Sequence, residues 1–199
     1  MRSAGWARAL ARLLVRARVS PNAISVAGIA FALLGAYAVL DWSNTTAGLV
    51  AAAACAQLRL VCNMLDGMVA IEGGRQSAVG ALYNEIPDRI ADSLLIVALG
   101  YAAGAPWLGW LGALAAAVTA YIRVLGGACG LPYDFRGPLA KPQRMFVMTL
   151  GCLIGAVELT ARGSHWSLLA ASWILAAGAL LTCALRALAI AAQLRGRAS

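Results

Sequence analysis

The sequence predicts an all-α, polytopic membrane protein with six transmembrane helices, preceded by an amphipathic helix at the N-terminus. Of its 199 residues, 62% are hydrophobic, which is more than a soluble domain of this size needs. The apolar residues also fall into runs that are long enough to cross a bilayer, which takes about 20 helical residues. We therefore expect a single membrane-embedded domain over residues 1–199.

Six apolar runs mark the expected spans. They cover residues 22–40, 47–65, 79–103, 107–127, 143–161 and 166–190. In residues 1–19, arginines alternate with Trp6 and with leucines at helical spacing, and this segment is too short and too charged to span. We expect it to lie in the headgroup layer as an interfacial helix. The alternative is a basic N-terminus that is simply solvated.

The basic residues predict the orientation in the membrane. With six spans threaded, the basic residues at the helix ends gather on the side of both termini, and the opposite side receives only Arg162. The positive-inside rule then places both termini in the cytoplasm, which suggests the inner membrane of a bacterium. The net charge of +8 fits contact with anionic lipid headgroups. Because the charges are spread among helix ends, we expect no nucleic-acid partner.

One stretch, from Asn63 to Asp92, breaks the apolar pattern. Asn63 and Asp66 are three residues apart, and Asn84 and Asp88 are four apart, so each pair shares one face of a helix. If the second span descends and the third returns, the two faces meet at the edge of the membrane. Oxygen ligands of this kind suit a hard cation such as Mg²⁺. The segment between the pairs contains Gly73 and Gly74, which predict a turn.

Two of the carboxylates, Asp88 and Asp92, enter the third span. Ionisable groups at that depth are costly unless they serve a site or meet a partner. We expect Arg89 to pair with Asp92, three residues away, which leaves Asp88 without a structural partner. The alternative is that the charged residues of this stretch cap helix ends and face water.

The spacing of this stretch resembles the signature of the CDP-alcohol phosphatidyltransferase family. That signature reads Asp-Gly-x2-Ala-Arg-x8-Gly-x3-Asp-x3-Asp, with a further aspartate three residues before it. The matching residues are Asp66, Gly67, Ala70, Gly80 and Asp88. The segment SPNAIS at the start of the first span also resembles the family, and the similarity covers nearly the whole chain.

The resemblance implies an enzyme of phospholipid biosynthesis. It would transfer a phosphatidyl group from CDP-diacylglycerol to an alcohol acceptor and release CMP, with Asp88 as the base that deprotonates the acceptor. One or two Mg²⁺ or Mn²⁺ ions would bind at positions 63, 66, 84 and 88, and a homodimer is expected. The residues expected to bind the donor are Pro21, Asn22, Ser25, Gly67, Ala70, Arg75, Ser77 and Gly80.

Three positions depart from the signature. Asn63 and Asn84 stand where the family has aspartate, so the site loses two negative charges, and Ile71 stands where the family has arginine. We expect Glu85 to restore charge as a further metal ligand, ahead of Asp92. Arg75, four residues after Ile71, is the candidate replacement for the missing guanidinium.

The acceptor site is expected near the fourth and fifth spans. Arg123 lies inside the fourth span. The Pro and Gly content predicts a loop at residues 126–142, which includes Lys141 and is followed by Arg144. An arginine at membrane depth suggests a phosphate or carboxylate partner, because its planar donors suit those groups. The alternative is that these residues anchor the chain on the positive-inside side.

Three alternatives remain for the function. A catalytically impaired relative could act as a membrane binding or scaffold protein. A transporter-like bundle would need polar residues along a path through the bilayer, and here the charges stop at one face. The motif would also fit an enzyme that uses a soluble CDP-alcohol donor and a lipid acceptor.

Overall fold

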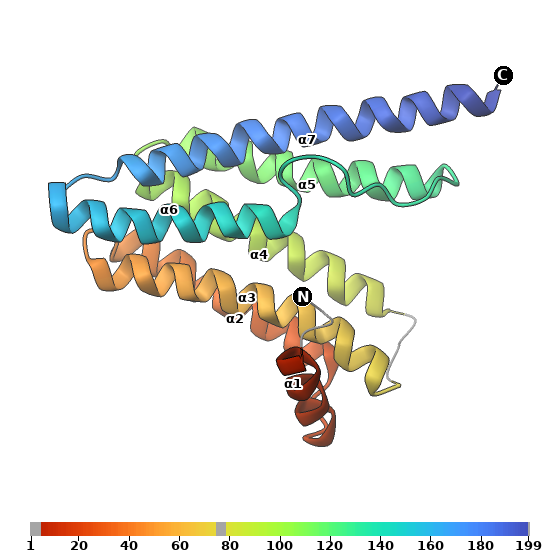
Figure 1. The fold of residues 1–199 in the computed structure, drawn as a ribbon, viewed down its shortest axis with the longest axis horizontal. Helices are drawn as coiled ribbons and strands as arrows, with labels where there is room; N and C mark the ends of the chain where they lie inside the picture. The colour runs from red at the N-terminus through yellow and green to blue at the C-terminus, as the bar shows by residue number, and fades with distance from the viewer. Residues whose placement is uncertain (1–4, 75–78, 199) are drawn as a thin grey trace.

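A computed structural model describes residues 5–74 and 79–198, and it consists of helices in these ranges (Figure 1). In chain order, the helices are α1 (Gly5–Arg16), α2 (Pro21–Asp41), α3 (Thr46–Glu72), α4 (Gly80–Ala102), α5 (Pro106–Ala128), α6 (Lys141–Arg162) and α7 (Trp166–Ala198). The all-α prediction is confirmed, and α2 to α7 coincide with the six apolar runs.

Five of these helices, α2, α3, α5, α6 and α7, are long and apolar enough to cross a membrane. Helix α4 has 23 residues but is not one of the five. Residues 80–92 of this helix include four charged residues, namely Glu85, Asp88, Arg89 and Asp92. The count of six spans therefore stays a prediction, as does the interfacial position of α1.

Local sequence signals explain several helix ends. The side chain of Ser20 caps α2 by accepting a hydrogen bond from the backbone of Ala23, with Pro21 at the first helical position. Helix α3 ends at Glu72, and Gly74 then takes a φ of +60°, which a residue with a side chain rarely adopts. The predicted turn at the glycine pair is confirmed.

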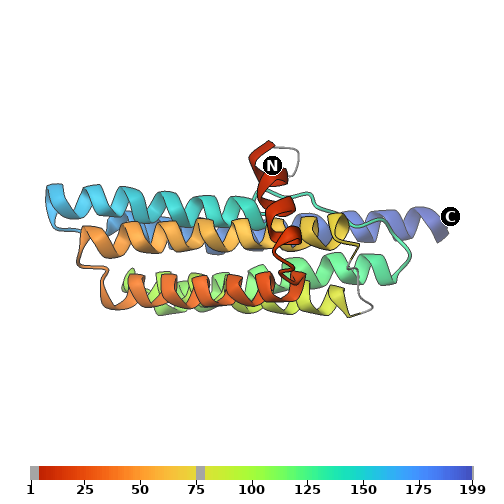
Figure 2. The same ribbon diagram turned by 90° about the horizontal axis from the view of Figure 1, so that it is seen from below.

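The long helices run along one axis, and α1 lies across them in both views (Figures 1 and 2). Helix α3 packs between α2 and α6, while α5 packs between α4 and α7. The α2–α3, α4–α5 and α6–α7 connections lie at one end of the molecule, on the left in Figure 1. The C-terminal end of α3 and the N-terminal end of α4 lie at the other end. The charged residues of these two helix ends are thus brought together.

Small residues bring the helices close to one another. The main buried cluster is rich in alanine and is completed by larger residues such as Leu95, Leu99 and Met148. Between α4 and α5, a Cβ atom added at Gly109 would collide with the backbone of Val97. Close backbone approach of this kind is typical of helix packing in membranes. It fixes the helix that carries Asp88 against its neighbour.

Candidate active site

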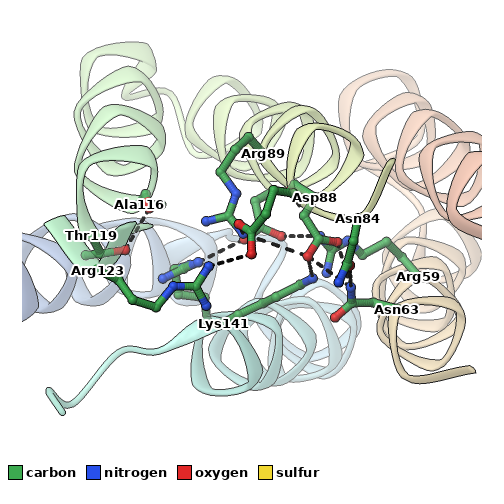
Figure 3. Close-up of polar contacts among 12 residues, drawn as sticks. Arg59, Asn63, Asn84, Asp88, Arg89, Ala116, Thr119, Arg123 and Lys141 are labelled. Carbon is green, nitrogen blue, oxygen red and sulfur yellow. Dashed lines mark hydrogen bonds and ion pairs between the residues drawn. The ribbon is translucent and has the colours of Figure 1, made fainter. Parts of the chain in front are cut away.

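Asp88 lies where three helices meet. Helix α3 presents Arg59 and Asn63 one turn apart, α4 presents Asp88, and Lys141 is the first residue of α6 (Figure 3). The amide Nδ2 of Asn63 donates to both carboxylate oxygens of Asp88, at 2.8 and 2.9 Å, and lies 3.2 Å from Oδ1 of Asn84. The two predicted faces therefore meet.

Three cations surround the Asp88 carboxylate. Nη2 of Arg59 lies 3.1 Å from Oδ1, the ammonium of Lys141 pairs with Oδ2, and Arg89 is 3.8 Å from Oδ2. The expectation that Asp88 lacks a structural partner is wrong. Its partners come mainly from α3 and α6, so the sequence around Asp88 does not reveal them.

Asp66 shares a small cavity with Asp88. The buried carboxylate of Asp66 accepts hydrogen bonds from Oγ of Ser25 at 2.8 Å and from the backbone of Gly67 at 2.6 Å. A cavity of about 10 Å³ is bordered by Asp66, Asp88, Ser25 and Arg59. Such a space holds about one water molecule. The two motif carboxylates thus face a common space.

Behind Asp88, the carboxylate of Asp92 forms two ion pairs inside the bundle. It lies 2.7 Å from Nη2 of Arg59 and 2.9 Å from Nη2 of Arg144, and all three side chains are buried. The expected pair between Arg89 and Asp92 is wrong. Nη2 of Arg89 instead lies 3.6 Å from Oε2 of Glu85. The partners of Asp92 are arginines of α3 and α6.

A larger pocket of about 420 Å³ opens beside Asp88 and is lined by basic side chains. These are Arg89, Arg123, Lys141, Arg144 and Arg186. The guanidinium of Arg123 pairs with Glu85 at 2.6 Å and lies over the ring of Phe135, at 5.4 Å from the ring centre. The three residues expected to bind the acceptor therefore line one pocket, and that pocket includes the proposed base.

Two residues of the site, Arg59 and Arg186, are missing from the sequence-based prediction. Arg186 is buried and donates to the backbone oxygens of Arg136 and Thr119, each at 2.9 Å. A signal for both exists in the sequence, because each is a charged residue within an apolar run. Ionisable residues in such runs are functional candidates by default.

The expected donor residues are only partly gathered. Ser25 and Gly67 contact Asp66, and the backbone oxygen of Pro21 lies 3.3 Å from Oγ of Ser25. Asn22 is in the first turn of α2, Ala70 is near the end of α3, and Gly80 begins α4. Arg75 and Ser77 lie outside the described residues, so the replacement of the motif arginine by Arg75 stays a prediction.

The side chains around Asp88 do not fit a pair of divalent ions. In residues 5–74 and 79–198, no three acidic, histidine or cysteine side chains gather as metal ligands. Glu85, expected to restore charge, is engaged with Arg123. Two carboxylates remain, Asp66 and Asp88, against the four that the family signature provides. A pair of divalent ions would thus be left with only half of its counter-charge.

The nearby cations oppose a metal ion further. An ion bound to Asp88 at about 2.1 Å would lie within about 5 Å of Nη2 of Arg59, which is 3.1 Å from that carboxylate. At an effective dielectric constant of about 20, a divalent ion and a single positive charge at this distance repel by about 7 kcal/mol. Lys141 adds a second repulsion of the same kind, because it pairs with the same carboxylate.

Two known proteins similar to this chain carry the same name. No family model matches the sequence. The phosphatidylinositol phosphate synthase of Mycobacteroides abscessus is 27% identical over 184 residues, covering 89% of this chain and 80% of that protein. The enzyme of the same name from Corynebacterium glutamicum is 29% identical over 187 residues, covering 87% and 78%. The chain is similar to phosphatidylinositol phosphate synthases.

The fold agrees with this similarity. Two crystal structures of the Mycobacterium tuberculosis phosphatidylinositol phosphate synthase, one with manganese and citrate and one with CDP-diacylglycerol bound, each match with a TM-score of 0.76 at 23% identity. The first match covers 92% of this chain and 88% of that one, and the second covers 94% of each. The relatives' name agrees with the reaction class that the motif resemblance implies.

Proposed function

We propose that this chain transfers a phosphatidyl group from CDP-diacylglycerol to a hydroxyl of an alcohol acceptor and releases CMP, in phospholipid biosynthesis. The observation that carries the proposal is the shared cavity of Asp66 and Asp88, the two carboxylates kept from the family signature. Asn63 and Asp88 line both this cavity and the basic pocket. The similarity to phosphatidylinositol phosphate synthases along most of the chain supports the same reaction class.

In this reaction, the acceptor oxygen forms a bond to the phosphorus that carries diacylglycerol. The bond between this phosphorus and the oxygen bridging to CMP breaks, and CMP leaves with the electron pair. The proton of the acceptor hydroxyl passes to the carboxylate of Asp88. The side chain of Asp88 is 14% exposed and borders the basic pocket, so a hydroxyl held there can approach it.

The acceptor that fits this pocket is a phosphorylated polyol. Arg123 and Arg144 supply donors that suit a phosphate, and Arg186 adds a third cation. Arg144 and Arg186 are held by backbone oxygens and by Asp92, so their positions are fixed before an acceptor arrives. The name of the relatives points to an inositol phosphate as the acceptor.

The protein would act at the inner membrane of a bacterium, as one membrane-embedded domain over residues 1–199. Helix α4 would form the sixth span, because its charged side chains pair with cations of α3, α5 and α6 inside the bundle. Helix α1 lies across the long helices and exposes Trp6 and Leu13, which suits the headgroup layer. The active site and both termini would face the cytoplasm, and the protein would form a homodimer.

An assay of CMP release tests this function. The purified protein receives CDP-diacylglycerol labelled in its CMP group, together with inositol phosphate, glycerol phosphate, inositol or glycerol. We expect CMP release with a phosphorylated acceptor and little with its unphosphorylated counterpart. Failure to release CMP with every acceptor would contradict the proposal.

A variant of the basic pocket sharpens the assignment of the acceptor. Arg123→Gln removes a charged donor worth about 1.5 to 3 kcal/mol, so we expect the KM for the phosphorylated acceptor to rise about tenfold to a hundredfold. Arg162→Gln, at the opposite end of the bundle, is the matched control and should leave the KM unchanged. An unchanged KM in Arg123→Gln would remove this residue from the acceptor site.

The second candidate is a catalytically impaired relative that binds the nucleotide lipid as a scaffold. It is favoured by Asn63 and Asn84 at two motif positions and by the cations that already occupy Asp88. The CMP assay separates the two, because a scaffold binds CDP-diacylglycerol without releasing CMP. Adding CDP-ethanolamine with a diacylglycerol acceptor tests the reversed roles of donor and acceptor in the same format.

A further inference from the structure

We propose that Arg59 and Lys141 replace the pair of divalent ions in this chain, so that it binds the donor diphosphate without a metal. The inference rests on the proposed function and deepens it. The proposal states which positive charges offset the two phosphate groups of CDP-diacylglycerol. Three observations support this proposal.

The first observation is a balance of charge. The family signature provides four carboxylates, whose charge of −4 two divalent ions offset with +4. Here Asn63 and Asn84 are neutral, which leaves Asp66 and Asp88 with a charge of −2. Arg59 and Lys141 bring +2 to the same place, because both pair with Asp88. These two cations offset the two remaining motif carboxylates, while Arg89 lies against Glu85 and Arg144 against Asp92.

The second observation is the position of Arg59. Its side chain is only 1% exposed, and Nη2 is held between Asp88 at 3.1 Å and Asp92 at 2.7 Å. The guanidinium cannot lose its proton in a protein, so its charge is permanent. Arg59 also borders the cavity shared by Asp66 and Asp88. Arg59 is thus a fixed cation beside the cavity where the family signature would predict bound metal ions.

The third observation is a buried donor that has no acceptor. Nη1 of Arg59 is buried and makes no hydrogen bond. Buried polar groups are almost always satisfied, and an unsatisfied donor costs about 1 to 3 kcal/mol in general. A phosphate oxygen in the adjoining cavity would satisfy it. Arg59 therefore has both the charge and a free donor for an anionic group.

Lys141 completes the arrangement from the other side of Asp88. Its ammonium group has three donors and lines the basic pocket while it pairs with Asp88. A phosphate in this pocket can therefore contact the ammonium group of Lys141. Asn63, whose Nδ2 donates to both oxygens of Asp88, adds no negative charge to this arrangement.

Direct binding of Mn²⁺ provides a test that does not depend on activity. The free Mn²⁺ signal in electron paramagnetic resonance is followed as wild-type protein is added, with Asp88→Asn as the comparison. We expect wild type to remove no more Mn²⁺ than Asp88→Asn does. We expect the variant Arg59→Met/Asn63→Asp/Asn84→Asp, which restores the four carboxylates and removes one cation, to bind Mn²⁺. Binding by wild type that Asp88→Asn abolishes would overturn the inference.

Binding of CMP in the presence of EDTA provides the second test. It does not require a variant with a restored metal site. We expect wild type to bind CMP with EDTA present, and Lys141→Met to bind it at least tenfold more weakly. Arg162→Met, at the far end of α6, is the matched control and should bind as wild type does. Equal binding by Lys141→Met and wild type would overturn the role of the lysine.

The CMP-release assay in EDTA separates this inference from the proposed function. Release that persists in EDTA supports both. Release that EDTA abolishes and Mn²⁺ restores overturns the inference and leaves the proposed function standing. No release in any condition contradicts the proposed function, and the Mn²⁺ and CMP binding results then decide whether Arg59 and Lys141 have replaced the ions.

Discussion

The carboxylate of Asp88 has a different environment from the one that its motif alone predicts. Spacing along the chain predicts that it lies opposite Asn63 and near Asp66, and the structure agrees. Its ion pairs with Arg59 and Lys141 cannot be read from spacing, because the partners are 29 and 53 residues away in sequence and reach it only through helix packing. Asn63 therefore acts as a hydrogen-bond donor to a carboxylate that already has cationic partners.

Asn63→Asp tests this view at a single residue. The substitution removes the donor to both Asp88 oxygens and places a like charge about 3 Å away, so we expect a lower melting temperature in detergent. Added Mn²⁺ should leave the melting temperature of wild type unchanged. Asn44→Asp, in an exposed turn, is the matched control. A variant as stable as wild type without Mn²⁺ would contradict the described hydrogen bonds.

Most helix ends could be predicted from the sequence to within a few residues. Each long helix contains an apolar run, and polar residues mark where that run ends. The second expected span closes at residue 65, whereas α3 continues to Glu72, where Gly73 and Gly74 end it. The polar residues of that last stretch look like a loop by hydropathy but lie on the helix that faces α4. Hydropathy alone also cannot show that the charges of α4 are paired inside the bundle.

Asp92 joins three of these helices. It lies on α4 and binds Arg59 of α3 and Arg144 of α6, all of them buried. Breaking a buried pair by removing one charge leaves the other uncompensated and costs about 3 to 5 kcal/mol. We expect Asp92→Asn to lower the melting temperature strongly, and to do so with and without substrate.

The control for this prediction is Asp41→Asn, at the exposed end of α2. It should melt within about 2 °C of wild type, because surface changes usually cost less than about 0.5 kcal/mol. If Asp92→Asn melts together with the control, the buried network does not hold α3, α4 and α6 together.

For the whole molecule, the arrangement of the helices gathers the site at one end. The fold class follows from composition and run length, and the similarity to solved structures agrees with it. The basic pocket could be predicted in part, since Arg123, Lys141 and Arg144 are clustered in the sequence. Arg186 could not be placed, because α7 joins the pocket only through its packing against other helices, mainly α5 and α6.

Labelling of cysteines tests the proposed orientation. Cys129 is exposed just after α5, at the basic end of the molecule. A membrane-impermeant maleimide should leave Cys129 unlabelled in intact cells and should label it after permeabilisation. In a variant where Cys129 is the sole cysteine, adding Ser164→Cys between α6 and α7 should introduce labelling in intact cells. The reverse pattern would invert the orientation.

Release of CMP by Asp88→Asn decides whether Asp88 performs the proton transfer on which the proposed reaction depends. Loss of a positioned general base costs about a hundredfold to ten-thousandfold in rate, so we predict a fall in kcat of at least a hundredfold. Binding of CDP-diacylglycerol and the elution profile of the folded protein should be retained, and Asp41→Asn should keep full activity. Turnover of Asp88→Asn at the wild-type rate would contradict the assignment of Asp88 as the base.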